Sequence, residues 1–137
     1  MLITRKVEFS ASHSCYNPKL SEAENRALYG ESADSHSHGH NYVLEVTLEG
    51  EPDPVTGMVF DLKRLKDVLQ REVVEPMDHR FLNREVPPFQ ETIPTPENIA
   101  REIWKRLDGP LRLPNARLHS VRLYETEDLF VEYSEAG

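Results

Sequence analysis

Apolar and polar residues alternate along several segments of this chain, as expected where one face of a β-strand is buried. The alternation predicts strands over residues 6–11 and 38–49. Residues 118–124 and 129–133 show similar patterns near the end of the chain, and residues 58–60 form a shorter apolar run. We therefore expect two early strands, a short third strand and two late strands.

Between the long strands, the spacing of apolar residues changes to that of helices. Asp61 is a suitable N-cap for a first helix, which Pro76 should end. Residues 95–97 (Thr-Pro-Glu) have the cap, the proline and the acidic residue typical of a second helix start. The apolar faces of the two helices contain Leu62, Leu65, Leu69 and Val73, and Ile99, Ile103, Trp104 and Leu107, respectively. Strands grouped apart from helices favour an α+β fold with an antiparallel sheet.

Length and composition narrow the class of protein. A chain of 137 residues is expected to form one domain, residues 1–137, and its hydrophobic fraction of 38% suggests that oligomerisation adds to its stability. The net charge of −8 argues against a nucleic-acid partner, because phosphate backbones need clustered lysine and arginine. With no apolar segment long enough for a membrane span, no signal-peptide pattern and the single cysteine Cys15, we expect a cytoplasmic protein.

Histidines stand at alternate positions in residues 36–40 (His-Ser-His-Gly-His), where a predicted strand begins. On that strand, His38 and His40 should point to the same face. His13 follows the first strand, whose end would lie beside the start of the next if the two pair antiparallel. Three neutral imidazoles would leave one zinc position open, so we interpret these residues as metal ligands, although a lone histidine is more often a surface or hydrogen-bonded core residue. His36 is interpreted as a loop residue or a partner of a ligand.

Other residues suited to chemistry each have an alternative interpretation. Asp78 can orient the imidazole of His79 in a proton relay, although adjacent residues of an exposed turn need no such role. Glu125 lies on the apolar face of a predicted strand, where a ligand with two N–H donors or a salt bridge to an arginine would satisfy it. Cys15 is either near the metal as a thiolate or buried and inert.

Together, these residues resemble the 6-pyruvoyl tetrahydropterin synthase family, whose superfamily includes 6-carboxytetrahydropterin synthase of queuosine biosynthesis. The resemblance extends from about Val7 to Tyr133, and an ordered set of short segments is more specific than one His-x-His motif. The matching segments are 9–13 (Phe-Ser-Ala-Ser-His), 16–20 (Tyr-Asn-Pro-Lys-Leu), 24–25 (Glu-Asn), 28–30 (Leu-Tyr-Gly), 38–42 (His-Gly-His-Asn-Tyr), 56–59 (Thr-Gly-Met-Val), 77–79 (Met-Asp-His), 95–98 (Thr-Pro-Glu-Asn) and 124–126 (Tyr-Glu-Thr). The insertion over residues 16–30 resembles the pyruvoyl-forming branch.

The resemblance implies a tunnelling fold, in which a four-stranded antiparallel sheet carries two helices on one face. In this family, three subunits close their sheets into a barrel, two trimers stack as a homohexamer, and the active sites lie between subunits. Closure removes exposed sheet edges, which suits a chain with a small core.

The resemblance also implies roles for individual residues, carried over by position. They are the zinc ligands His13, His38 and His40, the proton-relay pair Asp78 and His79, the carboxylate of Glu125 that binds the amino-pyrimidine edge of the pterin, and Thr95 and Glu97 in a segment that lines the pterin pocket. Lys19, Arg26 and Arg80 are only candidates for contacts with a triphosphate.

The reaction that the resemblance implies converts 7,8-dihydroneopterin triphosphate to 6-pyruvoyl tetrahydropterin, a step of tetrahydrobiopterin biosynthesis. It is a carbon–oxygen lyase reaction that releases triphosphate, with zinc as Lewis acid. Two alternatives on the same scaffold are carbon–carbon lyases: the carboxy-forming reaction, which loses acetaldehyde, and aldol cleavage of the dihydroneopterin side chain. A third alternative is a hexamer that binds zinc and pterin without catalysis.

One position departs from the family pattern. The family normally has a catalytic cysteine in the loop before His-Gly-His; alignment through residues 28–30 puts Ser32 there, and counting back as in the short-loop branch gives Asp34. A serine hydroxyl is a far weaker base than a thiolate. Some family members use a glutamate in this loop, and Cys15 could reach in from the other side of the metal. We hypothesise that Asp34 or Glu31 is the base.

Overall fold

The computed structural model describes residues 1–34 and 37–135 and has an α+β fold. Its sheet has the strand order β3-β1-β2-β4-β5. The strands predicted by alternation are confirmed, mostly with longer bounds, as β1 (Leu2–His13), β2 (His38–Gly50), β4 (Ala116–Thr126) and β5 (Leu129–Tyr133). β1 with β2, β2 with β4, and β4 with β5 all pair antiparallel. The long strands therefore form the antiparallel sheet that the sequence predicted.

The sheet also contains a strand that the sequence pattern did not predict. β3 (Arg80–Phe81) pairs parallel with Ala11 and Ser12 of β1, at the edge opposite β5. The expected sheet of four antiparallel strands therefore gains a fifth, which is too short to show alternation. The strand expected at residues 58–60 is wrong, because these residues form a loop in which Val59 and Phe60 are both buried.

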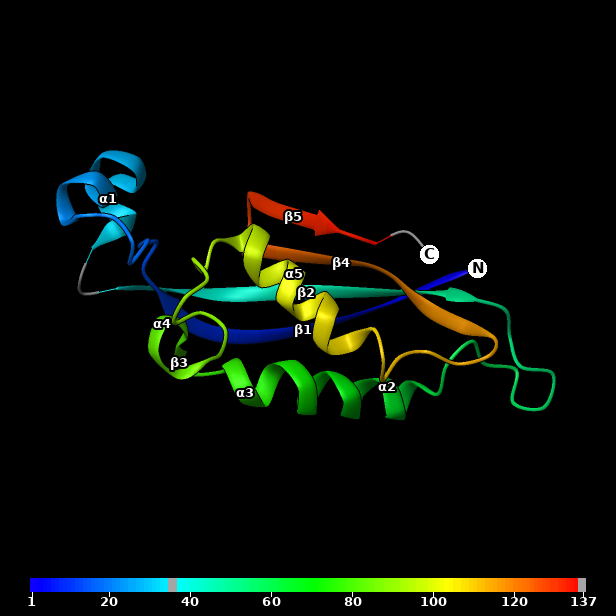
Figure 1. Ribbon diagram of the computed structural model, residues 1–137. Helices are drawn as coiled ribbons and strands as arrows, with labels where there is room; N and C mark the ends of the chain where they lie inside the picture. Colours follow the sequence, from blue (N-terminus) through cyan, green and yellow to red (C-terminus); the bar gives the residue numbers. More distant parts are fainter. Residues whose placement is uncertain (35–36, 136–137) are drawn as a thin grey trace.

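Helices run alongside the sheet (Figure 1) and bury one of its faces. They are α5 (Pro96–Leu107) and a helical stretch formed by α2 (Leu62–Leu69), the π-helical turn η2 (Gln70–Val74) and α3 (Glu75–Met77). The short α4 (Leu82–Glu85) follows β3. Alternate residues of the strands, such as Phe9, Leu44 and Leu123, pack with Leu69 and Ile103 of the helices in one core. Among the described residues, every helix is too short or too polar to cross a bilayer.

The first helical stretch differs from its prediction at both ends. Leu62 was expected on the buried face, but it lies in the first turn and is 56% exposed. Pro76 does not end the helix, which continues to Met77. A proline has no N–H to donate to the carbonyl four residues earlier, here that of Glu72. The π-helical turn changes the bonding pattern just before the proline, and Nη1 of Arg106 lies 3.5 Å from this carbonyl oxygen.

The long polar segment between β1 and β2 is folded rather than extended. It contains α1 (Glu22–Tyr29) and a 3₁₀ turn, η1 (Gly30–Ala33), and α1 lies beyond the end of the sheet (Figure 1). Ser21 and Glu24 form a capping box at the start of α1. The buried side chain of Asn25 donates to the carbonyls of Asn17 and Ser21, each at 3.0 Å. These bonds hold α1 against the segment that precedes it.

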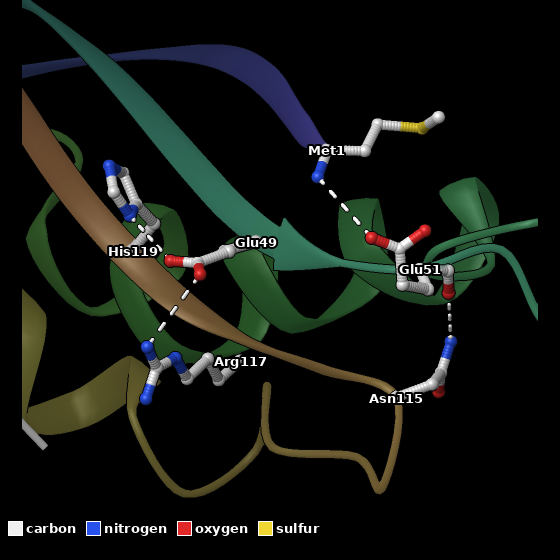
Figure 2. Close-up of polar contacts among 6 residues, drawn as sticks. All are labelled: Met1, Glu49, Glu51, Asn115, Arg117 and His119. Carbon is white, nitrogen blue, oxygen red and sulfur yellow. Dashed lines mark hydrogen bonds and ion pairs between the residues drawn. The ribbon is translucent and has the colours of Figure 1, made fainter.

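Polar contacts hold the opposite end of the sheet (Figure 2). The carboxylate of Glu49 on β2 lies 3.0 Å from Nδ1 of His119 and 3.6 Å from Nη2 of Arg117, both on β4. The N-terminal amine of Met1 lies 3.9 Å from the Glu51 carboxylate. These groups therefore pair with one another at the end of β2 that is far from His38.

Candidate active site

The register of β1 and β2 brings three histidines together. His13 stands opposite His38 in the last pair of the two strands, and His40 stands opposite Ala11. The ring centroids are 4.6 Å apart for His13 and His38, 5.0 Å for His13 and His40, and 4.9 Å for His38 and His40. One ring nitrogen from each residue lies within 4.8 Å of the other two. The predicted convergence of these imidazoles at the strand ends is therefore observed.

The two ring nitrogens of His13 have different surroundings. Nδ1 lies 2.7 Å from the carbonyl oxygen of Pro94, which can only accept, so the proton is on Nδ1. Nε2 is buried and has no hydrogen-bond partner among the described residues. Burial lowers the pKa of His13 to about 4, which keeps the ring neutral near pH 7. A neutral imidazole with one nitrogen fixed by a carbonyl and the other left free is the usual form of a metal ligand.

His40 contributes a second nitrogen without a hydrogen bond. Its Nε2 lies 3.2 Å from Oε1 of Glu125, but the contact lacks hydrogen-bond geometry, and Nε2 is otherwise unpartnered within the described part of the chain. Burial lowers the pKa of His40, against the opposing effect of the Glu125 carboxylate. The imidazoles of His13, His38 and His40 fit the donor set of a zinc ion that keeps one position open.

The lowered pKa of His13 predicts that the metal-free protein loses stability in acid. The unfolded chain takes up a proton on this residue as the pH falls below the ordinary pKa of 6.5, whereas the folded chain resists until about 4. The free energy of unfolding should therefore decrease by about 3 kcal/mol between pH 7 and pH 4 from this residue alone. Urea unfolding of the parent and of His13→Gln measures the effect, and equal pH dependence in both proteins would contradict it.

A groove beside the triad gathers further predicted residues. Its volume is about 780 Å³, and His40, Asp78 and Glu125 all line it. Glu125 reaches the groove from β4, and its carboxylate contacts His40. Among the described residues, no arginine forms the alternative salt bridge with Glu125. The groove therefore offers a carboxylate next to the candidate metal ligands, open to a ligand.

Asp78 and His79 contact each other, as a proton relay requires. Oδ1 of Asp78 accepts the N–H of Ser10 at 2.8 Å, and Oδ2 lies 2.8 Å from Nδ1 of His79. The N–H of Ser10 is the main cause that lowers the pKa of Asp78, and His79 lowers it further. His79 has a φ of +60° and its side chain is 83% exposed. A left-handed backbone is strained for a histidine and presents the imidazole to solvent while the carboxylate holds it.

The η1 turn is tied to the residues that directly follow His13. The N–H of Cys15 donates to the carbonyl of Ser32 at 2.8 Å, and Oγ of Ser14 donates to the carbonyl of Asp34 at 2.9 Å. Asn83 of α4 binds both backbone groups of Ser14, at 2.9 and 2.8 Å. The segment with the candidate bases is therefore anchored at the end of β1 that carries His13.

Cys15 is half-buried at this end of β1. Burial, together with the nearby carboxylates of Glu125 and Glu97, raises the pKa of its thiol to about 11. In the metal-free molecule the side chain is therefore a thiol near pH 7, which weakens its case as a thiolate base.

The remaining predicted residues form a helix cap or a surface ion pair, or are exposed to solvent. Thr95 caps α5 and accepts the N–H of Asn98 at 3.3 Å, and Glu97 is exposed in the first turn of that helix. Of the candidates for triphosphate contacts, Arg80 pairs with Glu85 at 3.5 Å. Lys19 and Arg26 are exposed, before and within α1 respectively. His36 lies outside the described residues.

Sequence reasoning missed the groups that orient the site. Pro94 and Ser10 act through their backbone atoms, on His13 and Asp78 respectively, and backbone atoms leave no signal in a sequence. Asn83 follows β3 closely, and only the unexpected pairing of β3 with β1 brings it to Ser14.

The comparison with known families agrees with this arrangement. A family model described as 6-pyruvoyl tetrahydropterin synthase matches residues 2–136. This chain belongs to that family. The 6-pyruvoyl tetrahydropterin synthases and their relatives have the tunnelling fold, so the fold predicted from the resemblance is confirmed, with β3 as an additional strand.

Relatives from both branches of the superfamily are similar to the chain over most of its length. The 6-pyruvoyl tetrahydrobiopterin synthase of Homo sapiens is 41% identical over 131 residues, covering 96% of this chain and 89% of the human protein. The structure of Caenorhabditis elegans 6-pyruvoyl tetrahydropterin synthase matches with a TM-score of 0.92 and 38% identity, covering 99% of this chain and 96% of that one. The 6-carboxy-5,6,7,8-tetrahydropterin synthase of Rickettsia conorii is 28% identical, covering 94% of this chain and 96% of its own length.

Proposed function

We propose that this chain is a zinc-dependent lyase that converts 7,8-dihydroneopterin triphosphate to 6-pyruvoyl tetrahydropterin with release of triphosphate. The observation that carries the proposal is the triad of His13, His38 and His40, whose ring nitrogens lie within 4.8 Å of one another beside a groove lined by Asp78 and Glu125. Such a triad next to a relay pair suits metal-assisted proton transfer better than binding alone, because binding needs no relay.

The choice of branch is supported by the degree of similarity. The relatives named 6-pyruvoyl tetrahydrobiopterin synthase, such as the human protein, are more similar to this chain than the carboxy-forming protein of Rickettsia conorii is. The insertion over residues 16–30, which contains α1, resembles that of the pyruvoyl-forming branch and also supports this choice.

Metal binding, pterin binding and proton transfer would each fall to different residues of the chain. A zinc ion held by the three imidazoles would act as a Lewis acid on the side-chain hydroxyls of the substrate. The carboxylate of Glu125 would accept two N–H groups of the pterin ring and fix its orientation. The exposed imidazole of His79, held by Asp78 at 2.8 Å, would transfer a proton to or from the substrate. Thr95 and Glu97, at the start of α5, would border the pterin.

We also propose that the base in the loop before β2 is Asp34 or Glu31. The hydrogen bonds from Ser14 and Cys15 hold this loop beside His13, so its side chains start close to the metal centre. A carboxylate can act as a general base without an activating neighbour, whereas a serine hydroxyl such as that of Ser32 needs one. Burial raises the pKa of the half-buried Cys15 thiol, which disfavours its thiolate form. A carboxylate therefore replaces the missing loop cysteine most simply.

The assembly we propose is a cytoplasmic homohexamer of two stacked trimers. In its support, β5 forms one edge of the sheet and carries Leu129 and Phe130, which are 50% and 44% exposed in the single chain. An exposed edge with apolar side chains is a common pairing surface. Light scattering should give about six times the mass of the chain, and a monomer at micromolar concentration would contradict the assembly.

One incubation tests the function and separates it from its rivals. Zinc-loaded protein is mixed with 7,8-dihydroneopterin triphosphate, and the pterin products, triphosphate and aldehydes are measured. We expect triphosphate release and 6-pyruvoyl tetrahydropterin without aldehyde. Triphosphate with acetaldehyde would place the chain in the carboxy-forming branch, and an aldehyde from dihydroneopterin itself would indicate aldol cleavage. Tight pterin binding without turnover would make it a binding protein that lost its base with the loop cysteine.

A further inference from the structure

The carbonyl that orients His13 belongs to a tight turn before α5. Pro94 is buried, and its carbonyl oxygen lies 2.7 Å from Nδ1 of His13. The carbonyl of the preceding Ile93 accepts the N–H of Thr95 at 2.8 Å, which closes a three-residue turn around Pro94. The direction of the Pro94 carbonyl therefore depends on whatever holds this turn in place.

Asn98 holds the turn from the first turn of α5. Its Nδ2 donates to the carbonyl of Ile93 at 2.9 Å, and its N–H donates to Oγ1 of Thr95 at 3.3 Å. The helix that carries Asn98 is fixed by its buried residues Ile99 and Ile103. One side of the turn is thus attached to a rigid element of the core, and the other side contacts the imidazole of His13.

We propose that Asn98 is a positioning residue of the metal centre. By holding residues 93–95, it keeps the Pro94 carbonyl where it orients His13, and so increases the affinity of the triad for zinc. This inference rests on the zinc centre of the proposed function. Direct partners of metal-bound imidazoles contribute about 10- to 100-fold in metal affinity. Because Asn98 acts through one more link, we expect an effect near the lower end, about 10-fold.

The competing explanation is that Asn98 serves only the start of the helix. The variant Asn98→Leu separates the two roles, because leucine has a similar branched shape and a better helix propensity but no donor for the Ile93 carbonyl. If Asn98 served the helix alone, this variant would form α5 and bind zinc as the parent does. If Asn98 positions His13, zinc affinity falls although the helix is intact.

The first measurement is zinc affinity by competition with a chelator, for parent, Asn98→Leu and the matched control Asn115→Leu. Asn115 also donates from Nδ2 to backbone carbonyls, of Glu51 at 2.8 Å and Val59 at 3.1 Å, but at the opposite end of the sheet (Figure 2). We expect a loss of about 10-fold for Asn98→Leu and none for the control. A loss smaller than about threefold, or an equal loss in both variants, overturns the inference.

A second measurement needs neither zinc nor turnover. In the metal-free protein with isotope-labelled histidine, the Nδ1 proton of His13 should exchange slowly with water, because it is buried and hydrogen-bonded. It should exchange faster in Asn98→Leu and as slowly as in the parent in Asn115→Leu. Unchanged exchange in Asn98→Leu overturns the positioning role. If the parent binds no zinc, the proposed function fails, and the exchange rates still decide the role of Asn98.

Discussion

Replacing His38 by alanine should lower the affinity for zinc more than about 100-fold, because losing a direct ligand costs more than losing a partner of a ligand. Turnover should fall at least as much. His38 is only partly buried and its Nε2 and Nδ1 anchor no described hydrogen bond, so the fold should survive its loss. Zinc content after dialysis and circular dichroism measure the two effects separately.

The control for this variant is His119→Ala. His119 also lies on a strand and contacts a carboxylate, that of Glu49 at 3.0 Å, but it lies at the far end of the sheet (Figure 2). The His119→Ala variant should bind zinc with the same affinity as the parent. Unchanged zinc affinity in His38→Ala, or equal losses in the two variants, would mean that the triad is not the metal centre.

Alanine at the position of the loop base should reduce kcat by about 10²- to 10⁴-fold, the usual contribution of a general acid or base. We expect this loss in either Asp34→Ala or Glu31→Ala, and zinc affinity should stay near that of the parent in both. Glu31 lies within η1 and Asp34 directly follows it, so the two carboxylates should not be equally close to one substrate proton, and the two variants should differ. Steady-state rates under saturating substrate give the comparison.

The variant Ser32→Cys completes this series. Full activity in both alanine variants, together with higher activity in Ser32→Cys, would exclude the carboxylates and assign the position of the base to residue 32. A cysteine there would introduce the thiol that the family normally has in this loop, in the role of the base.

The convergence of the three histidines could be predicted from the sequence because its geometry follows from strand periodicity. His38 and His40 share a face by their spacing, and antiparallel pairing brings the end of β1 to them. The same reasoning found the long strands and α5, whose alternation or capping signals are strong. It could not give the β1–β3 pair, because a strand of two residues shows no periodicity. It also could not give the continuation of the helix past Pro76, because the π-helical turn that permits it has no pattern in the sequence.

The surroundings of the triad could not be predicted for a different reason. The carbonyl of Pro94 is 81 residues from His13 along the chain and has no side-chain signature. The N–H of Ser10 that donates to Asp78 lies 68 residues from it along the chain and likewise has no side-chain signature. Such contacts depend on where the packing of the core places the start of α5 and the residues around β3 relative to β1, and no local sequence pattern encodes this.

The pairing of His13 with His38 in the last register position has a consequence for how this sheet forms. A slip of β2 by one residue would turn both His38 and His40 to the opposite face, away from His13. A metal ion would bind only the correctly aligned pair, and a ligand at about 100 times its Kd stabilises the state it binds by about 2.7 kcal/mol. The ion would thus act as a check on strand alignment during folding, before any substrate arrives.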